Sequence, residues 1–209
     1  MKVLIADDHA VVRRGLRQIL EAEPDLELAG EATSGTEVME ALRIQQYDVA
    51  VLDITMPGRG GLDVLHEIRQ RYPDLRVLVL SMHPEERYAL RVMKSGAAGY
   101  LTKESAPDEL IIALRKVAAG GKYVSPTLAE RLADEINTGV DKPLHERLSD
   151  REHQILCMIA SGMSVGGIAS KLQLGTNTVS TYRARLLGKL KLANNAELTH
   201  YAIRNRLID

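Results

Sequence analysis

The sequence contains no Trp and no Phe, only one cysteine and no long apolar run. Without Trp or Phe, its cores must be built from aliphatic residues, Met and a few Tyr. The lone Cys157 cannot form an internal disulfide, which favours a reducing cytoplasm. No apolar segment approaches the roughly 20 residues of a membrane helix, and the N-terminus is too short for a signal peptide, so we expect no membrane partner.

A strong net charge is also absent, but the charge is unevenly distributed. The 209 residues carry 27 Lys and Arg and 28 Asp and Glu, a net charge of -1. Residues 1–122 hold 16 basic and 19 acidic residues, whereas residues 146–209 hold 9 basic and 5 acidic residues. An acidic first half and a basic second half indicate different partners, and nucleic acid is the natural partner of the second.

Strand and helix patterns alternate over the first half of the chain. Five apolar strand segments are predicted, each followed by an amphipathic helix. Residues 26–32 alternate between apolar and polar, as an edge strand does, whereas residues 49–52 are continuously apolar, as in a strand buried on both faces. This pattern favours a doubly wound α/β domain with a five-stranded parallel sheet of the flavodoxin-like and CheY-like order 2-1-3-4-5.

Helix ends in this half carry their own signals. Ser34 and Glu37 form a capping box, and Ser105 is predicted to cap the fifth helix. Gly96 and Gly120 are expected to end the fourth and fifth helices.

Polar side chains directly follow four of the predicted strands. They are Asp7 and Asp8, Asp53, Ser81 and Lys103. Because the carboxyl ends of parallel strands meet at one edge of a sheet, these groups should share one crevice. Three carboxylates together cost energy unless they share a cation, and Mg²⁺ accepts both carboxylate and phosphate oxygens. The set therefore predicts a Mg²⁺ and phosphoryl site whose product is an aspartyl phosphate.

Within this set, the metal ligands are assigned by chemistry. Asp8 and Asp53 are expected to bind the metal directly, Asp7 one shell out or through water, and the backbone carbonyl of Thr55 is a further candidate ligand. Asp53 is then both ligand and nucleophile. The alternative is that Asp7 and Asp8 only cap a helix.

The remaining groups suit phosphate binding and switching. Lys103 would neutralise the phosphoryl charge, and Ser81 would bond a phosphoryl oxygen. Tyr100 can sit inward or outward depending on Ser81, which supplies the bistable element of a switch, although it could also simply pack on an outer strand. His9 and His83 are expected to shape access to the site.

A turn-rich stretch separates the two halves. Residues 123–145, with a helix predicted at 127–136, are interpreted as a linker between a domain at 1–122 and a domain at 146–209.

The second domain contains helix patterns only. Ser149 and Glu152 form another capping box, and Ser164 can cap the next helix. Two short helices joined by a tight turn at Gly175–Thr176, the second of them basic, describe a helix-turn-helix.

The second of these helices carries the candidate nucleic-acid contacts. Small polar residues and arginines opposite its apolar stripe suit a DNA major groove, and lysines suit phosphate contacts. The alternative is a solvated basic face on a helical bundle. The predicted contacts are Lys171, Asn177, Thr178, Ser180, Thr181, Tyr182, Arg183, Arg185 and Lys189.

These motifs resemble a known family. The segments Ile5–His9, Leu52–Gly58 and Ser95–Lys103 resemble the receiver domain of two-component response regulators. The segments Leu148–Glu152, Ile168–Ala169 and Thr178–Leu186 resemble the LuxR-type helix-turn-helix. Together they resemble the NarL/FixJ class of bacterial response regulators.

The resemblance implies a phosphorylation-controlled transcriptional regulator that is not an enzyme acting on other molecules. Asp53 would accept a phosphoryl group from a sensor histidine kinase, and Ser81 and Tyr100 would be the switch pair. Promoter DNA would be a partner, RNA polymerase a further candidate partner, and a homodimer would form on phosphorylation or on DNA, often through the last helix.

The sequence departs from this family at several positions. Gly166 and Gly167 stand where Lys and Glu are usual, Asn177 where Lys is usual, and Gly188 lies inside the recognition helix. A helical glycine costs about 1 kcal/mol relative to alanine, and positive charges usual at positions 166 and 177 are absent, so weaker non-specific DNA binding and a frayed domain are expected. Ser81 in place of Thr is a mild variant.

Two other classes of function compete with this one. A haloacid dehalogenase-type phosphatase also uses Asp, Mg²⁺, a hydroxyl and Lys, but needs a second Asp where this chain has Thr55. A regulator that binds DNA or a partner independently of phosphorylation is disfavoured by the complete polar set.

Overall fold

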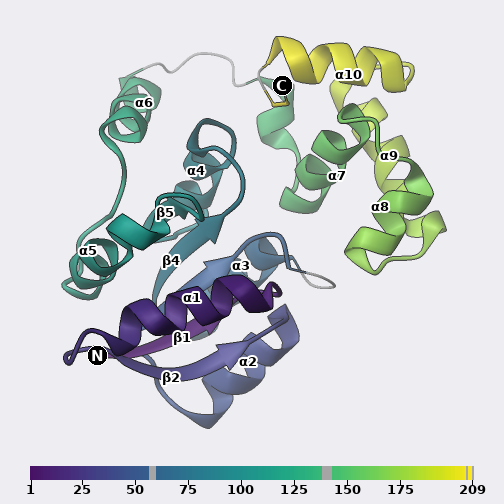
Figure 1. The fold of residues 1–209 in the computed structure, drawn as a ribbon. Helices are drawn as coiled ribbons and strands as arrows, with labels where there is room; N and C mark the ends of the chain where they lie inside the picture. Colours follow the sequence, from purple (N-terminus) through teal and green to yellow (C-terminus); the bar gives the residue numbers. More distant parts are fainter. Residues whose placement is uncertain (57–59, 138–142, 206, 209) are drawn as a thin grey trace. The chain divides into compact units, whose positions relative to one another are not determined.

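The computed structural model describes residues 1–56, 60–137, 143–205 and 207–208. The chain forms two compact units, Met1–Asn137 and Thr138–Asp209 (Figure 1). Each unit is described by itself.

The first unit contains a five-stranded parallel sheet. The strands are β1 (Lys2–Ala6), β2 (Glu27–Ala32), β3 (Val49–Asp53), β4 (Arg76–Ser81) and β5 (Gly99–Thr102). They are arranged in the order β2-β1-β3-β4-β5, which confirms the predicted fold class and order. All carboxyl ends therefore lie at one edge of the sheet.

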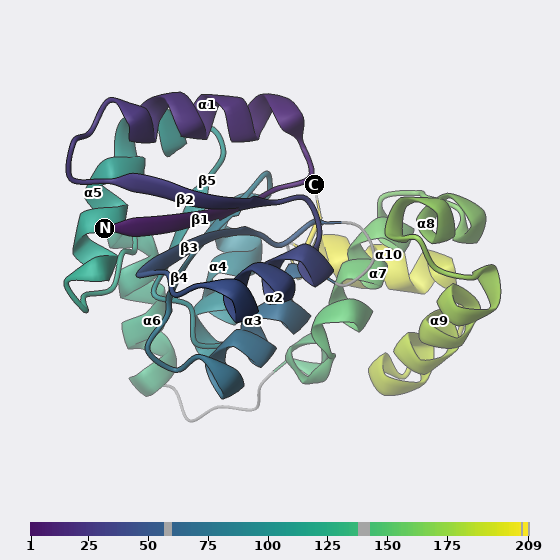
Figure 2. The same cartoon turned by 90° about the horizontal axis from the view of Figure 1, so that it is seen from below.

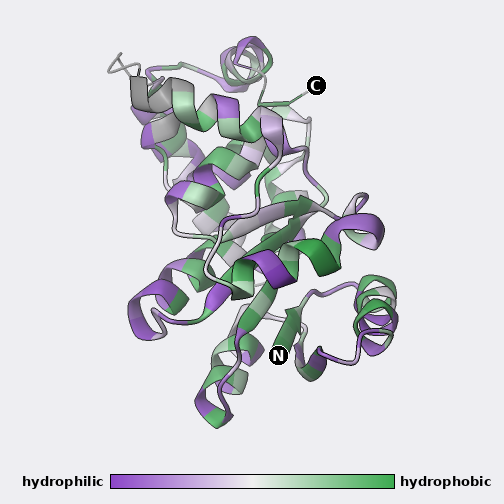
Figure 3. Cartoon of the chain, turned by 90° about the vertical axis from the view of Figure 1, so that its left-hand side faces the viewer, coloured by the Kyte–Doolittle hydropathy of each residue, from purple (hydrophilic) through white to green (hydrophobic). Residues whose placement is uncertain are grey.

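Helices cover both faces of this sheet. They are α1 (Ala10–Glu21), α2 (Gly35–Ile44), α3 (Gly61–Arg71), α4 (Glu85–Lys94) and α5 (Ala106–Ala118). In Figure 2, α1 and α5 lie on one side of the sheet and α2, α3 and α4 on the other. Hydrophobic and hydrophilic residues alternate along the helices, as expected for helices with one buried face (Figure 3).

Burial of the strands follows their sequence patterns. Every residue of β3 is buried, whereas the edge strand β2 buries only Ala32 completely. A continuous apolar run thus marks the central strand and an alternating one the edge.

The predicted helix ends are correct with two exceptions. Gly96 and Gly120 follow α4 and α5 with φ of 96° and 88°, the left-handed region that glycine adopts easily. Ser34 accepts a hydrogen bond from the Glu37 N–H at the start of α2, but the Glu37 carboxylate accepts from the Thr33 N–H and hydroxyl, so only one bond of the predicted capping box forms. Ser105, however, makes no capping bond to α5: its backbone is already helical, and its hydroxyl donates to the Thr102 carbonyl instead.

The helix after α5 packs on the first unit. α6 (Pro126–Asn137) contacts α4, and the residue Tyr123 before it pairs with Gly99 beside β5. The proposed linker boundaries at 123 and 145 remain a prediction, and residues 138–142 lie outside the described part of the chain.

The second unit is helical. It contains the 3₁₀ helix η1 (Leu144–Arg147), α7 (Asp150–Ala160), α8 (Val165–Leu172), α9 (Thr176–Leu190) and α10 (Asn195–Arg204). α8 and α9 form the helix-turn-helix, and their buried residues Ile168, Leu172, Val179, Leu186 and Leu190 contribute to the core.

Capping in this unit follows the sequence signals. Ser149 and Glu152 form both bonds of a capping box, and Ser164 accepts from the Gly167 N–H. α8 is helical through both of its glycines, and α9 continues past Gly188 to Leu190. The capping bond of Ser164 offsets part of the helical cost of Gly166 and Gly167.

Candidate functional site

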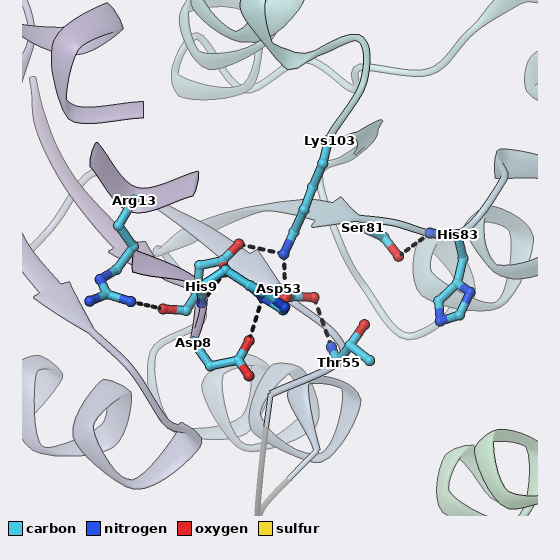
Figure 4. Close-up of polar contacts among 9 residues, drawn as sticks. Asp8, His9, Arg13, Asp53, Thr55, Ser81, His83 and Lys103 are labelled. Carbon is cyan, nitrogen blue, oxygen red and sulfur yellow. Dashed lines mark hydrogen bonds and ion pairs between the residues drawn. The ribbon is translucent and has the colours of Figure 1, made fainter. Parts of the chain in front are cut away.

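The carboxyl edge of the sheet gathers the predicted polar groups (Figure 4). Asp53 and Ser81 are the last residues of β3 and β4, and Asp7 and Lys103 directly follow β1 and β5. Asp7, Asp53 and Ser81 are each at most 1% exposed. Burying charged groups to this extent requires compensating partners.

Lys103 supplies that compensation. Its Nζ lies 2.6 Å from Asp7 Oδ2 and 2.7 Å from Asp53 Oδ2, and its side chain is 5% exposed. Burial lowers the pKa of the Lys103 ammonium, but the carboxylates of Asp53 and Asp7 raise it more, so the net pKa lies above its usual value. Lys103 is therefore a permanent cation between two anions.

The other oxygen of Asp53 is also fixed. Asp53 Oδ1 accepts a hydrogen bond of 2.8 Å from the Thr55 backbone N–H. The Thr55 hydroxyl is buried and makes no hydrogen bond within the described residues. The Asp53 carboxylate is therefore held in one orientation.

Asp8 and His9 complete the acidic side of the pocket. Ligand atoms of Asp7, Asp8, His9 and Asp53 all lie within 4.8 Å of one another. The side chain of Asp8 is 30% exposed, and His9 Nδ1 lies 2.8 Å from Asp8 Oδ1. Three carboxylates in this arrangement are consistent with a metal site and fit a hard divalent cation such as Mg²⁺.

The alternative of simple helix capping is not supported by the contacts. The residue that caps α1 is His9, without a side-chain bond to the first turn. Asp7 Oδ1 instead accepts from the His9 backbone N–H at 2.8 Å.

Ser81 and Tyr100 both contact the loop between β4 and α4. Ser81 Oγ accepts a hydrogen bond of 3.1 Å from the His83 N–H, and the Tyr100 hydroxyl donates one of 2.8 Å to the His83 carbonyl. Tyr100 is 3% exposed, so its ring is in the inward position. The backbone of His83 therefore contacts both members of the predicted switch pair, although the sequence predicted only that His83 borders the site.

Arg13 is a contributor that sequence reasoning missed. Its Nη1 donates a hydrogen bond of 2.7 Å to the Asp7 carbonyl, which is drawn as the dashed line from Arg13 in Figure 4. A basic residue on the first turn of a helix that follows an Asp-Asp pair is the only signal that could have indicated it.

The predicted DNA contacts do not all lie on one surface of α9. Asn177, Thr178, Thr181, Tyr182 and Arg185 line a shallow hollow on its outer side. Ser180 and the α8 residue Lys171 are also exposed. Of the residues lining the hollow, Tyr182 is half-buried and the others are exposed.

Two basic residues of α9 are engaged inside the second unit. Arg183 is half-buried and its Nε donates to Asn195 Oδ1 at 2.6 Å. Lys189 Nζ lies 2.7 Å from Glu152 Oε2, so it pairs with the capping box of α7. Their assignment as DNA contacts stays a prediction, and each also links α9 to another helix of the same unit.

None of the described helices is both long and apolar enough to span a membrane.

Comparison with known families finds a match for each part of the chain. Residues 3–115 match the response regulator receiver domain, and residues 146–202 match the bacterial regulatory proteins of the luxR family. The chain therefore belongs to the two-component response regulators of the NarL/FixJ class, in which a receiver domain precedes a DNA-binding helix-turn-helix. It is a response regulator and not a conventional enzyme.

Individual relatives match along nearly the whole chain. The response regulator UvrY of Escherichia coli K12 is 38% identical over 208 residues, covering 99% of this chain and 95% of UvrY. The response regulator GacA of Pseudomonas aeruginosa is 37% identical over 211 residues, covering 100% of this chain and 98% of GacA.

A solved relative has the same architecture. The response regulator RcsB of Salmonella typhimurium is 28% identical, with a TM-score of 0.70, and the match covers 100% of this chain and 98% of RcsB. RcsB has also been solved in a complex with DNA, at a TM-score of 0.61.

Proposed function

We propose that Asp53 is the phosphoacceptor of this response regulator and that its phosphorylation controls promoter binding. The observation that carries the proposal is the fully buried Asp53 carboxylate, fixed by the Thr55 N–H and flanked by Asp7, Asp8 and Lys103. A buried nucleophile beside a permanent cation suits the transfer of a dianionic group.

In the proposed reaction, an oxygen of Asp53 attacks the phosphorus of a phosphohistidine on a sensor histidine kinase. The new P–O bond forms as the P–N bond breaks, and the leaving imidazole nitrogen keeps the electron pair. Mg²⁺ held by Asp7, Asp8 and Asp53, with the Thr55 carbonyl as a further ligand, would neutralise the charge that accumulates in the pocket.

Lys103 and Ser81 act after transfer. Lys103 Nζ moves its contact from Asp53 Oδ2 to a phosphoryl oxygen, which keeps the cation paired. The Ser81 hydroxyl turns to donate to another phosphoryl oxygen. Tyr100 follows, because its hydroxyl is bonded to the loop that Ser81 holds.

The outer surface of α9 is the proposed DNA-reading surface. Asn177, Thr178, Ser180, Thr181 and Arg185 present hydroxyl, amide and guanidinium groups, the types that read base edges in a major groove. The complex of RcsB with DNA supports this assignment by family likeness. We further propose a homodimer on promoter DNA, contact with RNA polymerase and a cytoplasmic location.

The test is the intact mass of the full chain after incubation with acetyl phosphate and Mg²⁺. We expect one phosphoryl adduct on the wild type, none on Asp53→Asn, and an unchanged adduct on Asp63→Asn, which alters an exposed aspartate of α3. An adduct that persists in Asp53→Asn would refute the assignment.

Control of DNA binding is tested separately with the same samples. Phosphorylated protein should bind a mapped promoter fragment more tightly than unphosphorylated protein, with an affinity that falls as salt rises. Equal affinities for the two forms would instead favour a regulator that acts independently of phosphorylation.

A further inference from the structure

His83, in the loop between β4 and α4, is held from two sides by the proposed switch pair. Its backbone N–H donates to Ser81 Oγ, and its carbonyl accepts from the Tyr100 hydroxyl. Its ring stacks on Tyr88 of α4 with centroids 4.5 Å apart. Tyr88 is 4% exposed, so the position of His83 is coupled to the packing of α4.

Tyr100 also contacts the segment that leads into α6. Its backbone N–H donates to the Tyr123 carbonyl at 3.2 Å, and the Tyr123 N–H donates to the Ala98 carbonyl at 2.9 Å. A Cβ on Gly99 would lie 2.8 Å from the Tyr123 carbonyl oxygen, so this close approach requires glycine. The Tyr123 hydroxyl donates to Glu109 at 2.8 Å and anchors the segment.

A side-chain hydrogen bond then connects the start of α6 to the start of α4. Ser125 Oγ donates to Glu85 Oε1 at 2.7 Å and accepts from the Leu128 N–H at 3.0 Å. Glu85 is the first residue of α4, two positions after His83. Leu128 is 1% exposed where α6 packs on α4.

These contacts close a ring through His83, Tyr100, Tyr123, Ser125 and Glu85. We propose that the Ser125–Glu85 hydrogen bond is a latch that keeps α6 docked on α4 until Asp53 is phosphorylated. The inference rests on the proposed phosphorylation of Asp53. It assigns to α6, which precedes the DNA-binding unit in the chain, the role of reading the state of the pocket.

The release step follows from the same contacts. When Ser81 Oγ moves toward a phosphoryl oxygen, the His83 N–H loses this acceptor, while the Tyr100 hydroxyl and the Tyr88 ring still hold that residue. His83 and Glu85 shift together, because only Pro84 lies between them. The Ser125–Glu85 bond is only partly buried and joins two polar side chains without apolar packing of its own, so it breaks before the core contacts do.

The test is hydrogen exchange of the α6 amides in the full chain, with and without acetyl phosphate and Mg²⁺. Glu85→Ala removes the acceptor but leaves Ser125 to cap α6, and Ser125→Asp keeps an acceptor for the Leu128 N–H but cannot donate. Glu130→Ala, an exposed acid on α6, is the matched control.

We expect phosphorylation to speed exchange of the wild-type α6 amides by about tenfold, the effect of losing one hydrogen bond to a charged group. Glu85→Ala and Ser125→Asp should show this faster exchange without phosphorylation, and Glu130→Ala should behave as the wild type. Wild-type rates in both unphosphorylated latch variants would overturn the latch.

Intact mass of each sample separates failure of the latch from failure of the proposed function. An adduct on Asp53 without a change in α6 exchange would reject the coupling and retain the phosphoacceptor. Absence of an adduct would reject the phosphoacceptor and, with it, the phosphorylation-driven release.

Discussion

The acidic pocket and the outer surface of α9 hold polar groups in opposite ways. In the pocket, Asp7 and Asp53 are buried and paired with Lys103 inside the same unit. On α9, residues such as Asn177 and Arg185 are exposed. The first site pairs its buried carboxylates with a lysine of the same unit, whereas the second leaves its polar side chains exposed. Substitutions should therefore change stability in the pocket and mainly affinity on α9.

The largest effect is expected from Lys103→Met. Without the ammonium, Asp7 and Asp53 are left buried without compensation, which costs about 3–5 kcal/mol of unfolding free energy. Urea unfolding without divalent cations measures this loss. Asp53→Asn should cost less, because it removes one of the two carboxylates but leaves Lys103 paired with Asp7. Added Mg²⁺ should restore part of the stability of Lys103→Met. A stable Lys103→Met chain would show that the pocket is not electrostatically strained.

Arg185→Ala should weaken promoter binding by about 1–3 kcal/mol, since an arginine that reads a base edge contributes that much discrimination. Fluorescence anisotropy with labelled promoter DNA measures the affinity, and urea unfolding should be unchanged within about 0.5 kcal/mol. Arg14→Ala, which removes an exposed arginine of α1, is the control and should leave both unchanged. A large loss of stability in Arg185→Ala would mean that Arg185 also stabilises the fold of its own unit, as Lys103 is expected to do in the pocket.

Glu152→Gln tests the ion pair between Lys189 of α9 and the start of α7. Burial raises the pKa of Glu152, but Lys189 and the bonds with Ser149 lower it more, so the net pKa is below its usual value. The charged form therefore stabilises the fold above the unfolded-state pKa, and this stabilisation is lost as pH falls through the folded-state pKa.

The expected loss for Glu152→Gln at neutral pH is about 1–2 kcal/mol, the range of a charged capping interaction. Thermal unfolding of variant and wild type from about pH 7 to pH 3 should show the difference shrinking as pH falls. Lys189→Ala should weaken the same pH dependence, whereas Lys191→Ala should not. A constant difference across this range would contradict the charge argument.

The smallest effect is expected from Gly188→Ala. A Cβ at Gly188 meets nothing within 4 Å, so the variant should gain about 1 kcal/mol of stability. Gly166→Ala in α8 is equally open and should gain the same. If Gly188→Ala weakens DNA binding and Gly166→Ala does not, the missing side chain at Gly188 allows α9 to approach the DNA major groove closely. Equal DNA binding by the two variants would leave Gly188 without that role.

The pocket could be predicted because the carboxyl ends of parallel strands meet at one edge of a sheet. Apolar runs that stop at Asp7, Asp53 and Ser81 require those side chains to share one edge once the sheet is parallel. The rule fixes residues within one or two positions of a strand end. It could not find Arg13, whose guanidinium reaches the Asp7 carbonyl from a neighbouring helix.

Helix periodicity predicted the buried stripe of α9 but not its partners. In the sequence, Arg183 and Lys189 cannot be distinguished from Arg185 as basic residues of one helix. In the structure, Arg183 bonds Asn195 and Lys189 pairs with Glu152. Ser105 likewise has the composition of a cap but bonds to Thr102, because the preceding turn holds its backbone in a helical conformation. These outcomes depend on residues that approach only after folding.

The sequence by itself determined the order of the sheet, the two-domain class of protein, the acidic pocket and the second helix of the helix-turn-helix. Periodicity and strand ends are local properties of the sequence, and they fix which residues share a face or an edge. Only the tertiary structure decided that Lys103 bridges two carboxylates, that Tyr100 turns inward and that Ser125 meets Glu85. Those contacts join residues 17 to 96 positions apart, and their geometry is set by packing between elements that no local pattern specifies.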